Sequence, residues 1–585
     1  MLRMIISVRP FIHLPNLLHK PDFYFLGALM TRNLSRLAKA RYDVAVVGGG
    51  IYGACVAWDA SLRGLSVVLL EKGDFGSGTS ANSLKIIHGG FRYLQHGDVG
   101  RMRESMQEQM ALMRIAPHLV HPLPVLIPTY GHGLRGKEVF ACALAINDLI
   151  GFDRNRLDDP QKHIPRGRIL PRSEVLQLLP NISEQNLTGG GLFYDGMVYN
   201  SERLLLSFLH SAESMGAELA NYVKVGGYLR EIDNVRGIKA EDMISGERFP
   251  VEAKVVVNAC GPWSDQTEEI LSKGHGHQRI PWVKAFNLLT RPLFSSYAVG
   301  LAARGNYSDD RALFNKGKRL LFMVPWRDCS LIGTAYRSYE GNADQFSISE
   351  EDIHEFLQEI NQVYPHAALK TKDVAFVNGG LLPGAKMDSR SGDIQLENEA
   401  SIRTRGDVGA RNVISLVGVK FTTARRVGEH VVDRVFQILG KTPPASQTSV
   451  TPLHGGKIPN FQEFLNQEMD NSPRGLSPKA VHRLIYNYGS SYRAVLDYLP
   501  DTGGRDTHDE SESTGVLQAE VRYALQNEMA QRLSDVVFRR TELGTAGYPG
   551  DRPIEMCAAI LSKELGWNER QTQQELAKVR RLYPR

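Results

Sequence analysis

A glycine-rich turn near the start of the chain has the composition needed to bind a phosphate-containing ligand. Residues 48–53 read GGGIYG, which fits the pattern GxGxxG. We expect Gly48 to permit a tight turn, Gly50 to let the backbone approach a pyrophosphate, and Gly53 to allow a helix to pack closely on a strand. Because backbone N–H groups at the start of a helix favour negative charge, the turn predicts a dinucleotide site.

The flanking residues supply the elements that this turn requires. Residues 42–47 are an apolar run typical of a buried parallel strand, residues 54–62 have a helical pattern, and residues 66–70 form a second strand. Glu71 follows that strand at about the spacing of a ribose-binding acid. Together these features predict a βαβ unit of the Rossmann type.

Composition and charge are those of an ordinary globular protein. The 585 residues predict two or three domains, and 42% of them are hydrophobic and 23% charged. No apolar run approaches the roughly 18 residues of a membrane-spanning helix. Residues 1–42 hold seven Lys and Arg side chains and one acid, so the net charge of +5 is concentrated there. The remainder is nearly neutral without a basic face, which argues against nucleic-acid binding.

Cysteine usage indicates a reducing, cytoplasmic environment. The five cysteines are scattered, with no CxxC pair and no histidine at metal-ligand spacing. We therefore expect no metal site.

The ends of the chain differ in composition from its centre. Residues 1–40 are basic and contain prolines, which predicts a disordered leader outside the fold, with a transit peptide or a translation start at Met30 as alternatives. Residues 441–460 are rich in Pro, Ser, Thr and Gly and predict a linker. Residues 461–585 have mostly helical patterns and predict a C-terminal α-helical domain.

The stretch after the second strand resembles a known family. Residues 71–94 (EKGDFGSGTSANSLKIIHGGFRYL) are similar to the flavin-contacting stretch of FAD-dependent glycerol-3-phosphate dehydrogenases, which are D-amino-acid-oxidase-like FAD oxidoreductases. Residues 258–263 (NACGPW) and 417–425 (VGVKFTTAR) resemble the family's N-A-x-G-P-W turn and its G-G-K-L-T-T-x-R closing loop. The resemblance runs along most of the chain from Tyr42 and includes positions of the helical domain between residues 488 and 541.

This resemblance implies an α/β fold with two interleaved domains. A Rossmann-type FAD-binding domain would alternate along residues 41–440 with an antiparallel-sheet substrate domain, followed by the linker and the α-helical domain. The FAD-binding parts are expected near 41–115, 190–265 and 370–440, and the substrate parts near 116–189 and 266–369.

The cofactor that the resemblance implies is FAD. His88 is interpreted as a hydrogen-bonding group near the flavin, with covalent attachment as the less favoured alternative. The residues expected to bind FAD are Gly48, Gly50, Ile51, Tyr52, Gly53, Glu71, Lys72, Thr79, Ser80, Ser83, Lys85, His88, Gly89, Gly261, Gly418, Val419, Phe421 and Thr422.

The family reaction places three demands on the substrate site. Oxidising glycerol 3-phosphate at C2 requires a C–H bond directed at the flavin, a group that accepts the hydroxyl proton, and cations that hold the phosphate. The resemblance implies catalytic roles for Arg92, Tyr93 and Lys420, with Arg92 and Lys420 anchoring the anion and polarising the reacting oxygen.

Three substrate-facing motifs depart from the family pattern. Residues 284–287 (KAFN) end in Asn287 where the family has a histidine, and an amide cannot serve as the base. Residues 379–383 read GGLLP where the family has G-V-R-P-L, so Leu381 and Leu382 stand where the family arginine is expected. Residues 332–336 read IGTAY where the family has I-G-T-T-D. The residues expected to contact the substrate instead are Asn287, Arg337 and either Arg403 or Arg405.

The leading hypothesis is an FAD-dependent dehydrogenase that forms dihydroxyacetone phosphate and passes electrons to quinone or another acceptor. A related oxidoreductase acting on a different 2-hydroxy acid, polyol phosphate or amine is the first alternative, and a non-catalytic flavin-binding interaction protein is the second. The family resemblance also implies a peripheral contact with the cytoplasmic membrane face, for which residues 139–152 are the candidate segment, and leaves a homodimer open.

Overall fold

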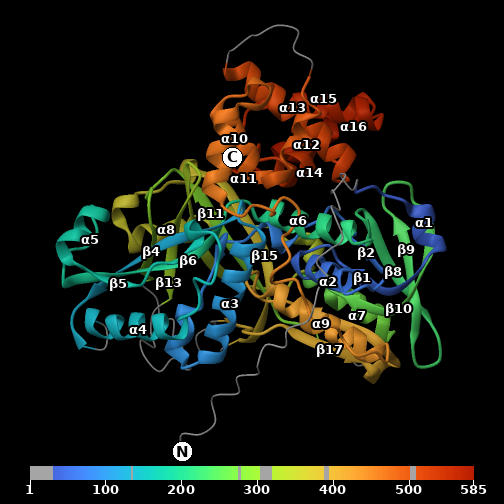
Figure 1. The fold of residues 1–585 in the computed structure, drawn as a ribbon, viewed down its shortest axis with the longest axis horizontal. Helices are drawn as coiled ribbons and strands as arrows, with labels where there is room; N and C mark the ends of the chain where they lie inside the picture. The colour runs from blue at the N-terminus through green and yellow to red at the C-terminus, as the bar shows by residue number, and fades with distance from the viewer. Residues whose placement is uncertain are drawn as a thin grey trace, which may run out of the picture.

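The fold is built from two β-sheets and a C-terminal group of helices. In Figure 1 the sheets lie side by side, and the C-terminal helices form a layer above them. The computed structural model describes residues 30–133, 136–273, 279–303, 319–387, 394–500 and 509–584.

The first sheet contains the βαβ unit predicted from the sequence. Its strand order is β17-β18-β10-β1-β2-β7, with β8 and β9 beside β10. β1 pairs in parallel with β10 and β2, and β10 pairs in parallel with β18. The strands are β1 Arg41–Val47, β2 Val67–Leu70, β7 Glu218–Ala220, β8 Val223–Arg230, β9 Val235–Asp242, β10 Arg248–Asn258, β17 Ser401–Arg405 and β18 Ala410–Val417.

Both faces of this sheet are covered, which explains the unbroken apolar run in β1. Val44 and Val46 belong to a core shared with the helices α2 (Ile51–Leu62), α6 (Ser201–Ser214) and α9 (Ala424–Ile438). The alternate residues Ala45 and Val47 belong to a second core with β8, β9 and α7 (Ser264–Ser272). Side chains of a strand alternate between faces, so the positions from Val44 to Val47, which are covered on both sides, are all apolar. Asp43, nearer the start of β1, is only partly buried.

The second sheet is mainly antiparallel. Its order is β16-β15-β11-β14-β13-β12-β4-β6-β3, with β5 beside β6, and only β12 and β4 pair in parallel among the described residues. The helix α8 (Glu350–Val363) packs against it, with Phe356 edge-on to Phe286 of β11. The strands are β3 Ile86–Ile87, β4 Val120–Tyr130, β5 Arg168–Pro171, β6 Leu187–Val198, β11 Trp282–Thr290, β12 Ala298–Ala302, β13 Leu320–Trp326, β14 Cys329–Tyr339, β15 Val374–Met387 and β16 Ile394–Leu396.

The two sheets are assembled from alternating segments of the chain, so the predicted interleaved α/β fold with a C-terminal helical domain is confirmed. The expected segment limits need correction. β6 and β15 fall within the ranges 190–265 and 370–440 expected for FAD binding, but both are strands of the second sheet. The reason is pairing, because β6 pairs with β4 along almost its whole length and β15 pairs with β11.

The C-terminal residues form a helical layer with two cores of their own. Residues 441–460, the predicted linker, contain no helix or strand, yet Leu453 is buried in the core of the first sheet. Within the described ranges, no helix is both long and apolar enough to cross a membrane. The helices of this layer are α10 Phe461–Asn471, α11 Pro478–Tyr488, α12 Arg493–Leu496, α13 Asp509–Asn527, α14 Leu533–Asp535, α15 Asp551–Leu565 and α16 Glu569–Arg580.

The predicted disordered leader is too long. Residues 1–29 lie outside the described residues, but residues 30–40 belong to the fold. Met30 is buried and bridges to Glu528, and the helix α1 (Leu34–Lys39) buries Leu37. Arg32 donates to the backbone oxygen of Asn221 at 3.1 Å. The basic composition of residues 1–40 predicted disorder, but Met30 and Leu37 are buried in hydrophobic cores of the fold.

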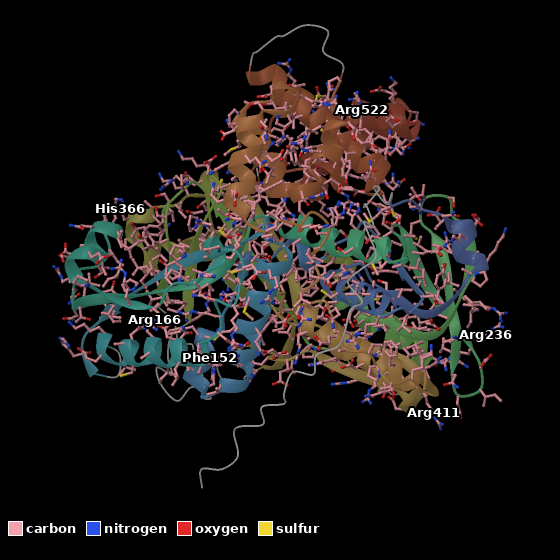
Figure 2. The ribbon with its side chains drawn as sticks, viewed as in Figure 1. Phe152, Arg166, Arg236, His366, Arg411 and Arg522 are labelled. Atoms are coloured by element: carbon pink, nitrogen blue, oxygen red, sulfur yellow. The ribbon has the colours of Figure 1, made fainter. Side chains whose placement is uncertain are left out.

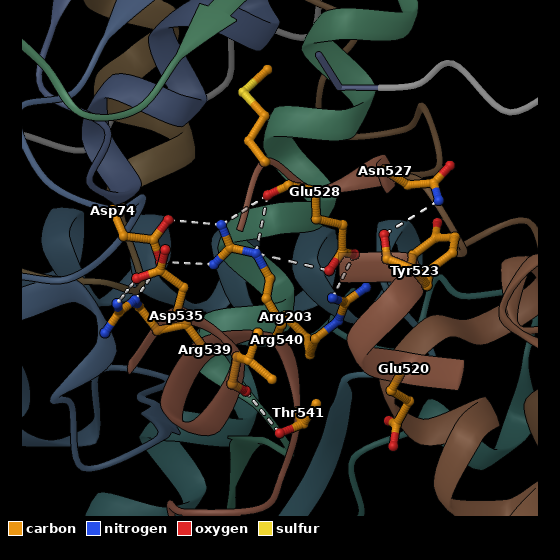
Figure 3. A network of polar contacts seen from close by, with 12 residues as sticks. Asp74, Arg203, Glu520, Tyr523, Asn527, Glu528, Asp535, Arg539, Arg540 and Thr541 are labelled. Atoms are coloured by element: carbon orange, nitrogen blue, oxygen red, sulfur yellow. Dashed lines mark hydrogen bonds and ion pairs between the residues drawn. The ribbon is translucent and has the colours of Figure 1, made fainter. Parts of the chain in front are cut away.

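A buried ion network joins the helical layer to the first sheet (Figure 3). Asp74, in the loop after β2, accepts two hydrogen bonds from Arg540 at 2.7 and 2.8 Å and a third from Arg539. Asn221 also donates to Asp74, at 3.0 Å. The side chains of Asp74 and Arg540 have no exposed surface. Burial alone raises the pKa of Asp74, but the two guanidinium charges hold it below its usual value.

The network continues through Glu528 at the end of α13. The backbone oxygen of Glu528 accepts from Arg540 at 2.9 Å, and its carboxylate accepts from Arg203 of α6 at 2.6 Å. Tyr222 donates to Asp535 of α14 at 2.7 Å. The contacts of Arg203 and Tyr222 join the first sheet and its helices to the C-terminal layer. The contact between Arg540 and Glu528 lies within that layer and holds Arg540 in place.

We predict that Arg540→Met destabilises the protein by about 3–5 kcal/mol, because it leaves the buried carboxylate of Asp74 without its bidentate partner. Urea unfolding followed by circular dichroism measures this change. Arg570→Met, in the exposed first turn of α16, is the matched control and should unfold like the parent protein. Equal midpoints for both variants would contradict the prediction.

Candidate active site

A cavity of about 1810 Å³ extends from the glycine turn after β1 to the second sheet. At one end it is lined by Gly48, Gly50 and Glu71, at the carboxyl ends of β1 and β2. At the other end it is lined by Asn287 and Thr334, from β11 and β14. It therefore adjoins the edge of a parallel sheet where dinucleotides bind, and continues to the second sheet.

The glycines of the turn are required for different reasons. Gly48 has φ +109°, and a Cβ there would lie 2.5 Å from the backbone oxygen of Ala259. A Cβ on Gly53 would lie 1.9 Å from the backbone oxygen of Gly48, so this glycine serves helix–strand packing as predicted. Gly50 has an ordinary φ of −79°, and its Cβ would approach only Ser80 Oγ, at 3.1 Å. Within the protein, a methyl group at Gly50 would require only the Ser80 hydroxyl to shift by a few tenths of an ångström.

Glu71 holds the turn as well as lining the cavity. Its carboxylate accepts hydrogen bonds from the backbone N–H groups of Gly49 at 2.6 Å and Gly73 at 2.8 Å. Burial raises the pKa of Glu71, and these two hydrogen bonds oppose that rise. Beside it, the Lys72 ammonium lies 4.2 Å from the ring centre of Trp263, and both side chains line the cavity.

Most of the residues predicted to bind FAD line this cavity. Two in the stretch after β2 do not: Lys85 and Gly89. Lys85 is turned into the protein, where its ammonium contacts Glu202 at 2.9 Å and Ser201 at 2.8 Å, and only 1% of its side chain is exposed. The Lys85 side chain therefore faces away from the cavity, because a buried carboxylate binds its charge, and its role in FAD binding stays a prediction. The predicted residues that line the cavity are Gly48, Gly50, Ile51, Tyr52, Glu71, Lys72, Thr79, Ser80, Ser83, His88, Gly261, Gly418, Val419, Phe421 and Thr422.

The closing loop after β18 is fixed by Tyr52 of α2. The Tyr52 hydroxyl donates to the backbone oxygen of Lys420 at 2.7 Å and accepts from the N–H groups of Val419 at 3.0 Å and Lys420 at 2.9 Å. A Cβ on Gly418 would lie 1.9 Å from the Tyr52 ring, so glycine is required there. Tyr52 thus positions the loop that carries Lys420.

The three residues predicted to be catalytic are brought together. Arg92, Tyr93 and Lys420 line the cavity, and the Lys420 ammonium donates to the Tyr93 hydroxyl and, at 2.8 Å, to the backbone oxygen of Asn398. Burial, and then the nearby positive charge of Arg101, lower the pKa of Lys420 to about 8. An anion placed beside these cations would be held by charge-assisted hydrogen bonds.

A histidine–carboxylate pair also lines the cavity. His88 Nδ1 lies 2.9 Å from Asp195 Oδ2, and the other oxygen of Asp195 accepts from the N–H of Gly89 at 2.7 Å. The sequence prediction missed Asp195, which lies on β6, more than a hundred residues after His88. The available signal was a single acid within an apolar strand.

The residues predicted to contact the substrate do not all line the cavity. Asn287 lines the cavity, but its amide oxygen accepts from Thr334 at 2.8 Å. Arg337 also lines the cavity and pairs with Glu355 at 3.1 Å. Arg405 does not line it.

The structure therefore does not bring Arg405 to the cavity. Its buried guanidinium pairs with Glu268 and, at 2.8 Å, with Asp407, and these carboxylates bind its charge away from the cavity. Arg403 is exposed on β17 and is also absent from the cavity wall. Arg101 and Arg319, which the sequence prediction missed, do line it.

We predict that Gly50→Ala leaves the fold intact but weakens FAD binding by about 10- to 100-fold, because the methyl group fits the protein but occupies the path of the pyrophosphate. Titration of the apoprotein with FAD, together with circular dichroism, measures both effects. Gly226→Ala is the control, since a Cβ there meets nothing within 4 Å. An FAD affinity equal to that of the control would refute this role of Gly50.

Family models match both parts of the chain. Residues 43–434 match the model described as FAD dependent oxidoreductase, and residues 446–572 match that of the C-terminal domain of alpha-glycerophosphate oxidase. The first match covers both sheets, and the second begins in the segment that leads to the helical layer.

Similar proteins share this full-length organisation. A glycerol-3-phosphate dehydrogenase of Synechocystis sp. is 32% identical, over 94% of this chain and 97% of its own. An alpha-glycerophosphate oxidase of Enterococcus casseliflavus is 28% identical, over 87% of this chain and 89% of its own.

A solved structure agrees with this assignment. The glycerol-3-phosphate dehydrogenase of Bacillus halodurans, determined with FAD, has a TM-score of 0.72 and 25% identity, and the match covers 94% of this chain and 95% of that one. The glycine turn, the cavity and the closing loop fit FAD. The chain therefore belongs to the FAD-dependent oxidoreductase family, with the C-terminal domain found in alpha-glycerophosphate oxidase.

Proposed function

We propose that this protein oxidises sn-glycerol 3-phosphate to dihydroxyacetone phosphate and passes the electrons to quinone. The observation that carries the proposal is the group of Arg92, Tyr93 and Lys420 in the same cavity as the FAD-binding turn. The similarity of the whole chain to glycerol-3-phosphate dehydrogenases supports the same substrate.

The residues of the cavity divide the work of the reaction. FAD, when bound, accepts the hydride from C2 of the substrate. Arg92 and Lys420 hold the anionic group and stabilise negative charge on the reacting oxygen. His88 accepts the hydroxyl proton, and Asp195 orients its ring through the contact at Nδ1. His88 thereby supplies the base that Asn287 cannot provide.

The alternatives lack an equally specific observation. An amine substrate needs no cluster of cations, and a non-catalytic flavoprotein needs neither these cations nor the His88–Asp195 pair. The departures at Asn287 and Leu381 still allow another polyol phosphate or 2-hydroxy acid. These substrates carry the same kind of anionic group, so they form the comparison panel for the experiment below.

Quinone as the acceptor is supported by the apolar wall of the cavity near α4 (Lys137–Ile150). Val139, Phe140, Ala143 and Ile146 of this helix line the cavity. Apolar side chains suit a quinone ring better than a charged acceptor. The similar proteins bear the names of both dehydrogenases and oxidases, so oxygen is the acceptor to compare.

We also propose that α4 makes a peripheral membrane contact. Ile146, Leu149 and Phe152 are exposed by 47%, 74% and 72%, although all three are large and apolar. Figure 2 shows Phe152 at the surface near the end of α4. The guanidinium group of Arg156 lies 5.8 Å from the centre of the Phe152 ring, which places positive charge beside the apolar surface. The homodimer and the cytoplasmic location stay predictions.

The first experiment measures anaerobic reduction of the flavin by glycerol 3-phosphate. The reduction is monitored as the loss of flavin absorbance near 450 nm. We expect rapid bleaching in the parent protein. His88→Gln should keep FAD but slow bleaching by about 10²- to 10⁴-fold, the usual contribution of a general base. His132→Gln, an exposed histidine outside the cavity, is the control.

Failure of the parent protein to bleach, with a flavin that dithionite still reduces, would reject glycerol 3-phosphate as the substrate. The panel of polyol phosphates, hydroxy acids and amines would then identify the alternative. Unchanged bleaching in His88→Gln would reject His88 as the base while leaving the substrate assignment in place.

We predict that Leu149→Ser combined with Phe152→Ser lowers binding to anionic phospholipid vesicles by about tenfold or more, because each apolar side chain contributes about 1.5–3 kcal/mol when removed from water. Sedimentation with the vesicles measures the bound fraction. Ile232→Ser is the matched control, since Ile232 is 98% exposed between β8 and β9. These two strands lie on the opposite side of the molecule from α4 in Figure 1. Equal loss in the control would contradict a specific contact through α4.

A further inference from the structure

Positive charge in the FAD cavity is neutralised at some positions and concentrated at others. The lysines and arginines that line the described part of the cavity are Lys72, Arg92, Arg101, Arg319, Arg337 and Lys420. Lys72, Arg319 and Arg337 form ion pairs with Asp344, Glu359 and Glu355. The other three, Arg92, Arg101 and Lys420, belong to the surroundings of Tyr93. Arg101 also pairs with an acid, Asp98, but through Nε alone.

Arg101 and Lys420 both lie against the Tyr93 ring. The Lys420 ammonium is 4.7 Å from the ring centre, and the Arg101 guanidinium carbon is 5.5 Å from it. Arg92 precedes Tyr93 in the chain and lines the same cavity. Arg101 comes from a different element, the first turn of α3 (Val99–Ile115), whose N-cap is Asp98.

The orientation of Arg101 leaves its binding edge available. Its contacts with acids are made through Nε, to Asp98 and, at 3.8 Å, to Glu399. Among the described residues, neither Nη1 nor Nη2 of Arg101 has a hydrogen-bond partner. A guanidinium held at Nε can still present both Nη groups to one phosphate, with parallel hydrogen bonds.

We propose that Arg101 is the third cation of the substrate-anion site and determines its preference for a phosphorylated substrate. This inference rests on the proposed function and adds to it a residue that the sequence did not indicate. Arg101 takes the part expected of Arg337, Arg403 or Arg405. Arg337 binds Glu355 through Nε and Nη2 and the backbone oxygen of Tyr336 through Nη1, so both of its Nη groups are occupied, unlike those of Arg101. Arg403 and Arg405 lie outside the cavity wall.

The test uses the FAD-loaded protein and anaerobic flavin reduction by glycerol 3-phosphate. We expect Arg101→Gln to lower kcat/KM by about 10- to 100-fold, mainly through KM, as expected for loss of a charge-assisted contact. Competitive inhibition by inorganic phosphate should weaken by a similar factor. Arg101→Lys should recover part of the loss, because it restores the charge without the planar fork.

Arg103→Gln is the matched control for the loss of a positive charge from α3. Arg103 lies two residues further along the helix, does not line the cavity, and pairs with Asp153. It should keep the parent KM and the parent phosphate inhibition. If Arg101→Gln also keeps both, the proposal is overturned.

The pH profile separates a role in the site from a merely structural one. The positive charges of Arg101 and Arg92 lower the pKa of Lys420, whereas Glu104 and Glu399 raise it. Substrate binding should therefore fall as the pH rises through about 8, where Lys420 loses its proton. In Arg101→Gln that fall should move to higher pH, because one lowering charge is gone. An unmoved profile would contradict the placement of Arg101 beside Lys420.

A failure of the proposed function would be distinguishable from a failure of this inference. If glycerol 3-phosphate does not reduce the parent flavin, inorganic phosphate can still be titrated into the FAD-loaded protein while the flavin spectrum is followed. Weaker phosphate binding by Arg101→Gln than by Arg103→Gln would support Arg101 as an anion-binding residue. Equal binding by the two variants would overturn that role.

Discussion

Asp74 carries a carboxylate without exposed surface only three residues after Glu71, whose own carboxylate holds the glycine turn. A buried charge of this kind is tolerated only when partners compensate its desolvation. The partners here are Arg539 and Arg540, which belong to the C-terminal layer. The loop that lines the dinucleotide end of the cavity therefore depends on a domain more than four hundred residues away in the chain. This dependence gives the helical layer a physical role at the FAD site.

The need to compensate a buried charge also distinguishes the other cations around the cavity. Lys85 and Arg405 are buried beside carboxylates, and their charges are compensated within the protein. Lys420 has no carboxylate at ion-pair distance among the described residues and contacts a phenol and a backbone oxygen instead. These contacts and the more distant Glu104 and Glu399 compensate its desolvation only in part, so an anionic ligand would stabilise it. The cations buried within the protein and those proposed to bind the substrate thus differ in their partners.

Local features of the sequence predicted local features of the fold. The apolar run of β1, the turn with Gly53, and Glu71 lie within about 30 residues of one another. The contacts of Gly53 with Gly48 and of Glu71 with Gly49 and Gly73 are also local. Lys85 and Arg405 were expected at the cavity, but each faces a buried acid that is distant in the sequence, Glu202 and Glu268 respectively. Asp195 and Arg101 were missed for a related reason. Neither belongs to a spaced motif, and each reaches the cavity only through strand pairing or the start of a helix.

The departures from the family pattern are also explained by partners and not by position alone. Leu381 is buried on β15, and its backbone exchanges hydrogen bonds with Thr79, at 3.0 and 3.2 Å, beside the FAD-binding stretch. An apolar side chain there packs without requiring a counter-ion. Phosphate binding depends on the number of cations that reach one small volume, whichever element carries them. A helix that begins beside Tyr93 can therefore replace a strand residue, and the loss of one arginine does not imply the loss of an anionic substrate.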